Sequence, residues 1–173
     1  MSQSLIEKIQ MIKVLVMDVD GILTDGRIIV DSHGKEIKNF DVQDGFGIVY
    51  FRKAGYKTAL ISARSAEAVS ARAKDLGIDK VYQDASPKLN AYLKLLTDFN
   101  VTEEEICYIG DDLPDLAVLK RAGLAVTVPN AVEEIKKVAD YITKKNGGAG
   151  AVRETIEVIL KTQNKWDDIV AAF

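Results

Sequence analysis

The sequence has only one cysteine, Cys107, and one histidine, His33, among its 173 residues. A single cysteine cannot form an internal disulfide, and without a Cys/His cluster the chain has no ligand set for a structural zinc ion. Three prolines and twelve glycines beside 47% hydrophobic residues exclude the disordered and collagen-like classes. The length suits one folded unit, so we expect a single domain over residues 1–173.

The chain also lacks long apolar runs and an excess of positive charge. Its apolar stretches, such as residues 14–17, are far shorter than the roughly 20 residues that cross a bilayer. Residues 1–13 have no apolar core of the kind a secretory signal needs. With 23 basic and 26 acidic residues the net charge is −3, which gives no cationic field for nucleic acid or anionic lipid. We therefore expect a soluble cytoplasmic protein with a small-molecule partner, no nucleic-acid partner and no membrane partner.

Short apolar runs alternate with amphipathic segments along the chain. Runs that are typical of buried strands lie at residues 12–17, 58–61, 80–82, 106–109 and 124–128. Apolar residues at helical spacing occupy residues 66–76, 89–96 and 116–122 between them. This alternation predicts a doubly wound α/β fold, a mainly parallel sheet with helices on both faces.

Two segments depart from the alternation. Residues 27–40 form two strand-like stretches around Ser32, His33 and Gly34, which predicts a projecting β-hairpin. Residues 144–150 are rich in glycine and lysine, which predicts a flexible segment, with a short helix at 152–160 and a polar tail reaching Phe173.

Polar side chains follow the predicted strands, where ligands bind in open α/β sheets. They are Asp18 and Asp20 after the first strand, Ser62 and Arg64 after the second, and Asp111, Asp112 and Asp115 after the fourth. Lys88 stands at the start of a predicted helix. Because the carboxyl ends of parallel strands meet at one edge, we expect these residues to share one crevice.

The residue types in this crevice indicate phosphoryl chemistry. Several carboxylates in one place repel one another unless a cation is present, and oxygen ligands alone favour Mg²⁺. A carboxylate can attack phosphorus, and a second one can donate and accept the proton, which are the roles we expect for Asp18 and Asp20. Ser62 and Lys88 can donate to the phosphate oxygens. The predicted catalytic residues are therefore Asp18, Asp20, Ser62 and Lys88.

In this order, Asp-Val-Asp-Gly-Ile-Leu-Thr at 18–24, Ser62, Lys88 and Gly-Asp-Asp-Leu-Pro-Asp at 110–115 resemble the motifs of the haloacid dehalogenase-like phosphohydrolases. The resemblance implies a metal site made by the Asp18 side chain, the Asp20 backbone carbonyl and Asp111. It also implies that Asp112 acts through a water molecule and that Asp115 orients Lys88.

The sequence has no room for the cap domain that usually covers the site in this family. Ser62 and Lys88 are 88 − 62 = 26 positions apart, which one helix and one strand fill, and the segment after the first motif holds only the hairpin. The stretches 39–48, 62–64 and 147–154 are similar to a capless branch that forms tetramers through its hairpins. This branch implies 3-deoxy-D-manno-octulosonate 8-phosphate as substrate, hydrolysed to the free sugar acid for lipopolysaccharide synthesis.

The same resemblance implies a substrate-binding set of Asp20, Asp41, Val42, Gln43, Asp44, Gly45, Arg64, Arg72 and Lys88. Arginine suits a sugar acid because its planar fork binds a carboxylate through two hydrogen bonds. Val49 stands where some members have arginine. The glycine-rich segment and the tail would reach the site of a neighbouring subunit.

Other interpretations remain open at this point. The substrate could be a sialic-acid-type nonulosonate 9-phosphate, and the chain could instead be a receiver-like phospho-aspartate switch or a regulatory descendant of the phosphatases. Ser62 could cap a helix, and Arg64 and Arg72 could form a solvated basic stripe. Cys107 is expected in the core.

Overall fold

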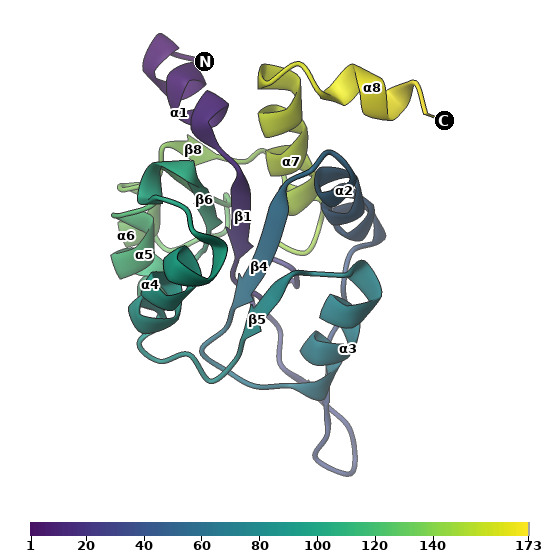
Figure 1. Cartoon of the computed structure of the whole chain (residues 1–173). Coiled ribbons are helices and arrows are strands. Elements are labelled where there is room, and N and C mark those ends of the chain that lie inside the picture. The colour runs from purple at the N-terminus through teal and green to yellow at the C-terminus, as the bar shows by residue number, and fades with distance from the viewer. Residues whose placement is uncertain (173) are drawn as a thin grey trace.

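The computed structural model describes residues 1–172 and arranges them around a six-stranded parallel sheet (Figure 1). The strands are β1 (Val14–Met17), β4 (Lys57–Ile61), β5 (Lys80–Tyr82), β6 (Ile106–Ile109), β7 (Leu124–Thr127) and β8 (Tyr141–Ile142), in the order β5-β4-β1-β6-β7-β8. All four residues of β1, and all four of β6, are buried, because strands inside a parallel sheet are covered on both faces. The predicted strands are confirmed, and β8 is an addition.

Helices cover both faces of the sheet, which confirms the doubly wound α/β fold. On one face lie α2 (Val42–Lys53), α3 (Glu67–Leu76) and α7 (Ala151–Thr162), and on the other α4 (Lys88–Phe99), α5 (Leu116–Leu119) and α6 (Glu133–Lys136) (Figure 1). Short 3-10 turns η1 (Glu103–Glu105) and η2 (Leu113–Asp115) flank β6, while α1 (Gln3–Met11) precedes β1. Among residues 1–172, none of the helices combines the length and apolarity needed to cross a bilayer.

Helix α2 was not expected from the hydrophobic pattern. Its segment contains Gly45 and Gly47, which disfavour helix and blur the periodicity. The helix forms because Asp41 caps it, accepting the backbone N–H groups of Gln43 at 2.7 Å and Asp44 at 3.1 Å, and because it packs against α7. Long-range packing therefore decides this element.

A small antiparallel hairpin projects from the body. Its strands β2 (Ile29–Val30) and β3 (Glu36–Ile37) pair Ile29 with Ile37, and the loop extends at the bottom of Figure 1. Between β1 and β4 the chain forms only this hairpin and α2, and between β4 and β5 only α3. Within the described residues there is accordingly no cap domain.

The glycine-rich segment packs closely on the loop that follows β1. A Cβ at Gly147 would lie 1.7 Å from the Gly21 carbonyl oxygen, and the Gly148 N–H donates to the Ile22 carbonyl at 2.8 Å. Close approach thus explains glycine at Gly147, where composition alone predicts a flexible segment. The tail forms α8 (Trp166–Val170) against α7, and Phe173 lies outside the described residues.

Candidate active site

The carboxyl ends of β1, β4 and β6 open into a crevice of about 150 Å³. It is lined by Asp18, Asp20, Ser62, Ala63, Arg64, Lys88, Asp112, Pro114 and Asp115. All four residues predicted to be catalytic therefore lie in one crevice, although they come from two strand ends and one helix.

Lys88 is a buried cation between two carboxylates. As the first residue of α4 it extends its Nζ atom to 2.6 Å from Asp18 Oδ1 and 2.7 Å from Asp115 Oδ1, with 3% of its side chain exposed. Burial acts to lower the pKa of Lys88, but the Asp18 and Asp115 carboxylates more than offset it, so its pKa is raised. Lys88 consequently holds a positive charge against Asp18.

Asp115 is fully engaged in hydrogen bonds. Its Oδ1 also accepts the Tyr108 hydroxyl at 2.5 Å, and its Oδ2 accepts the backbone N–H groups of Asp111 at 3.2 Å and Asp112 at 3.3 Å. These contacts let it fix both the Lys88 side chain and the loop after β6. Tyr108 was not expected here, because in the sequence it is one more residue of an apolar strand.

The acidic cluster fits a divalent cation. Carboxylate oxygens of Asp18, Asp111 and Asp115 lie within 4.8 Å of one another. Burial first, then the Asp115 charge, raises the pKa of Asp18 to about 8 and that of Asp111 to about 7. Asp111 Oδ1 is buried without a hydrogen-bond partner. A cation would relieve the repulsion and satisfy this oxygen. Both oxygens of Asp115 accept hydrogen bonds, whereas Lys88 contacts only Oδ1 of Asp18, so Asp18 and Asp111 are the better placed side chains to hold the cation.

Gly21 allows Asp111 to approach the loop after β1. Its backbone has φ +92°, and a Cβ there would lie 2.1 Å from Asp111 Oδ2. A side chain at this position would displace the carboxylate and strain the backbone.

Asp20 faces the hairpin. Its Oδ1 accepts the Lys38 ammonium at 2.5 Å, and the same Nζ lies 2.6 Å from Glu36 Oε1. Arg64 completes the network, with Nη2 2.9 Å from Glu36 Oε2 and Nε 3.8 Å from Asp20 Oδ2. Sequence reasoning missed Glu36 and Lys38, although their i, i+2 spacing in a strand places both on one face.

Ser62 and Asp112 each accept a hydrogen bond from a nearby backbone N–H group. Ser62 Oγ accepts the Arg64 N–H at 3.2 Å, which leaves its hydroxyl proton to donate into the crevice. Helix α3 begins beyond it at Glu67, so Ser62 caps a turn and not a helix. Asp112 is exposed and accepts the Leu113 N–H at 2.8 Å at the start of η2.

Part of the predicted substrate-binding set lines a second hollow, of about 220 Å³, between α2 and α3. Val42, Gly45 and Arg72 lie there beside Val49. Arg72 pairs with Asp75 at 2.7 Å and does not line the crevice of Asp18. Arg64 and Arg72 thus belong to different hollows and do not form one basic stripe.

The remaining members of that set lie at the start of α2. Asp41 is the cap of this helix, and Gln43 is exposed. Asp44 is buried and accepts the backbone N–H groups of Arg153 at 2.7 Å and Gly150 at 3.3 Å. Its burial, partly opposed by the Arg153 hydrogen bond, raises its pKa to about 6. Only Asp20, Arg64 and Lys88 of the set lie in the crevice.

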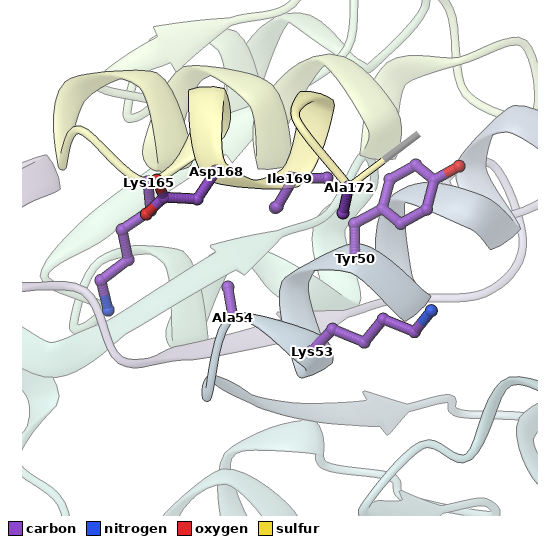
Figure 2. Close-up of a pocket in the computed structure, with 7 residues that line it drawn as sticks. All are labelled: Tyr50, Lys53, Ala54, Lys165, Asp168, Ile169 and Ala172. Atoms are coloured by element: carbon purple, nitrogen blue, oxygen red, sulfur yellow. The ribbon is translucent and has the colours of Figure 1, made fainter.

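A roomier cavity, of about 510 Å³, lies apart from these residues (Figure 2). Tyr50, Lys53 and Ala54 of the α2 end face Lys165, Asp168, Ile169 and Ala172 of the tail across it. It contains none of the predicted site residues, so size does not identify the reactive centre here.

Known proteins resemble this chain in sequence and in overall structure. A family model described as haloacid dehalogenase-like hydrolase matches residues 80–156. The 3-deoxy-D-manno-octulosonate 8-phosphate phosphatase KdsC of Escherichia coli K12 is 40% identical over 167 residues, covering 96% of this chain and 89% of KdsC.

Solved structures agree with the sequence match. The 3-deoxy-D-manno-octulosonate 8-phosphate phosphatase of Moraxella catarrhalis, in complex with magnesium, phosphate and KDO, superposes with a TM-score of 0.97 at 45% identity, covering 100% of this chain and 99% of that one. The cobalt-bound enzyme of Haemophilus influenzae has a TM-score of 0.88 at 37% identity, covering 91% and 92%. The chain therefore belongs to the 3-deoxy-D-manno-octulosonate 8-phosphate phosphatase family of the haloacid dehalogenase-like hydrolases.

Proposed function

We propose that this protein is a Mg²⁺-dependent phosphatase that converts 3-deoxy-D-manno-octulosonate 8-phosphate into the free sugar acid for lipopolysaccharide synthesis. The observation that carries the proposal is the buried Asp18–Lys88–Asp115 array beside Asp20 and Asp111. The names of the relatives and the magnesium, phosphate and KDO bound in the Moraxella enzyme support the same substrate and ion.

In the first step an Asp18 carboxylate oxygen attacks phosphorus and forms a new P–O bond. The P–O bond to the sugar breaks, and its electron pair leaves with the sugar oxygen. The Asp20 carboxyl group donates its proton to that oxygen, so the sugar acid leaves as an alcohol and Asp20 becomes a carboxylate.

In the second step a water molecule attacks phosphorus of the aspartyl phosphate and gives a proton to the Asp20 carboxylate. The P–O bond to Asp18 breaks, inorganic phosphate leaves, and both aspartates return to their starting forms. Ser62 Oγ and Lys88 Nζ donate to the phosphate oxygens in both steps.

Mg²⁺, held by Asp18, Asp111 and the Asp20 backbone carbonyl with Asp112 acting through water, would supply charge stabilisation for the phosphate oxygens. Asp115 acts by holding Lys88. We assign the substrate carboxylate to Arg64, which is half exposed at the mouth of the crevice and carries a planar donor fork. Arg72 and the residues at 41–45 belong to the proposed binding surface around the second hollow.

We also propose that the enzyme is a cytoplasmic homotetramer. Within the described residues no cap domain covers the crevice, so a neighbouring subunit would close it and exclude water from the aspartyl phosphate. The projecting hairpin exposes Ile28, Ile29, Val30 and Ile37, an apolar surface that suits contact with further copies. The free, buried Cys107 is typical of a reducing compartment.

The proposal is tested by phosphate release with excess Mg²⁺ and with EDTA. The substrates are 3-deoxy-D-manno-octulosonate 8-phosphate, a nonulosonate 9-phosphate and glucose 6-phosphate. Metal-dependent preference for the octulosonate is the expected result. Preference for the nonulosonate would reassign the substrate, and no release from any ester would favour the receiver-like or regulatory alternatives.

A further inference from the structure

Lys38 is a half-buried residue outside the crevice lining, with a side chain that is almost completely covered. Its side chain is 2% exposed, yet it extends from the hairpin to Asp20 Oδ1 at 2.5 Å and to Glu36 Oε1 at 2.6 Å. Burying an ammonium group costs free energy unless carboxylates compensate for the lost water, and both partners here are carboxylates. The hairpin is therefore tied to the residue that we propose handles the proton.

The contact distinguishes the two oxygens of Asp20. Lysine has only donors, so the oxygen it contacts must act as an acceptor. When Asp20 is a neutral carboxyl group, Lys38 thus keeps Oδ1 as the carbonyl oxygen and leaves Oδ2 to carry the proton. A general acid needs its proton on the oxygen that faces the leaving group, because efficiency depends on hydrogen-bond geometry.

Arg64 cannot replace Lys38 in this role. It approaches Asp20 Oδ2 only at 3.8 Å, through a side chain that is 54% exposed, and we have assigned it to the substrate carboxylate. Once the substrate engages Arg64, Lys38 is the remaining cation that holds the Asp20 carboxyl group.

We propose that Lys38 is a positioning residue, which orients Asp20 so that Oδ2 delivers the proton to the leaving sugar oxygen. This inference rests on the proposed phosphatase function. Glu36 supports Lys38 from the same hairpin face, so the hairpin takes part in catalysis within its own chain.

The test compares two leaving groups in Lys38→Met. A sugar alkoxide needs protonation as it leaves, whereas a p-nitrophenolate leaves without it. The ratio kcat/KM reports steps up to formation of the aspartyl phosphate, so the shared second step does not enter. We expect kcat/KM for the sugar acid phosphate to fall roughly 10- to 100-fold. A positioned general acid contributes ~10²–10⁴-fold to the rate, and Lys38→Met removes its positioning but not the acid itself. For p-nitrophenyl phosphate we expect a change below about threefold.

Three variants accompany Lys38→Met. Lys35→Met removes the exposed hairpin contact to Glu67, at 3.0 Å, and should leave both substrates unchanged. Asp20→Asn removes the proton donor itself, so its selective loss of kcat/KM on the sugar acid phosphate is the largest that a positioning defect can reach. Lys38→Gln keeps a hydrogen-bond donor but loses the charge, so it should give the same selectivity at smaller size, which keeps the test available if Lys38→Met does not fold.

Each possible outcome either supports or overturns the proposed role of Lys38. A selective loss on the sugar acid phosphate in folded Lys38→Met or in Lys38→Gln supports the proposal. Equal losses on both substrates, no loss, or the same loss in Lys35→Met would overturn it while the phosphatase function stands. A wild-type protein that releases phosphate from neither ester overturns the proposed function, and with it this inference.

Discussion

At the residue scale, Asp111 is expected to lower the stability of the metal-free protein and to bind the metal ion. Its buried, unpartnered Oδ1 lies among other carboxylates, and burial raises its pKa to about 7. In EDTA at pH 8, Asp111→Asn should raise the free energy of unfolding by roughly 1–3 kcal/mol, because it removes a poorly compensated charge. Mg²⁺ should stabilise the wild type and stabilise this variant much less.

Urea unfolding with EDTA and with saturating Mg²⁺ measures both effects. Asp167→Asn, an exposed aspartate on α8, is the matched control. If Asp111→Asn were less stable than the wild type in EDTA, or gained as much from Mg²⁺, the assignment of Asp111 to the ion would be wrong.

Asp44 should make stability depend on pH. Burial raises its pKa from 3.8 to about 6, so between these values the folded state holds a proton that the unfolded state has lost. The contribution of the neutral carboxyl group is present below pH 3.8 and is lost as pH rises through about 6, an effect of up to about 3 kcal/mol. The difference in unfolding free energy between wild type and Asp44→Asn should change by that amount between pH 4 and pH 7.

Asp168→Asn, an exposed aspartate, provides the comparison for this pH series. A constant difference between wild type and Asp44→Asn across the series would show that Asp44 titrates normally and that its burial has no energetic cost.

At the element scale, the glycine-rich segment supports the catalytic loop. Gly147 touches the Gly21 carbonyl oxygen, and its N–H donates to Asn130 Oδ1 at 3.2 Å. Gly147→Ala adds a methyl group 1.7 Å from that oxygen, so one of the two segments must move. We expect a loss of roughly 2–4 kcal/mol in unfolding free energy and a fall in kcat, since Gly21 follows Asp20.

Ala149→Val enlarges an exposed neighbour in the same segment and should affect neither quantity. Chemical unfolding and phosphatase kinetics on the two variants decide the point. Wild-type stability and activity in Gly147→Ala would mean that the segment is not packed on the loop in solution.

At the scale of the whole molecule, the hairpin should control assembly. Ile29 and Ile37 face each other across β2 and β3 and are 42% and 50% exposed. The double change Ile29→Glu with Ile37→Lys keeps a favourable cross-strand pair but removes the apolar surface. Sedimentation velocity should show a tetramer for the wild type and smaller species for the double variant, with a lower kcat/KM.

Val170→Lys, which changes an exposed apolar residue on α8, should leave the assembly intact. A monomeric wild type, or an unchanged double variant, would contradict the hairpin interface.

The sequence by itself determined five of the six strands of the sheet and the positions of the polar residues that follow them. Residues 14–17, 59–61 and 106–109 are apolar because inner strands of a parallel sheet are covered on both faces, so their composition alone marks them as strands. The shared location of Asp18, Ser62 and Asp111 then follows from the chain direction, because the carboxyl ends of parallel strands lie at one edge of the sheet.

The tertiary structure alone decided which polar groups contact one another. Asp44 is turned toward α7, Tyr108 holds Asp115, and Lys38 reaches Asp20 across 18 positions of chain. The local sequence pattern indicates which side of an element is buried, whereas these contacts join different elements, and their geometry depends on how the elements pack. Burial then sets their strength, because removing water makes each partner of a charged group indispensable.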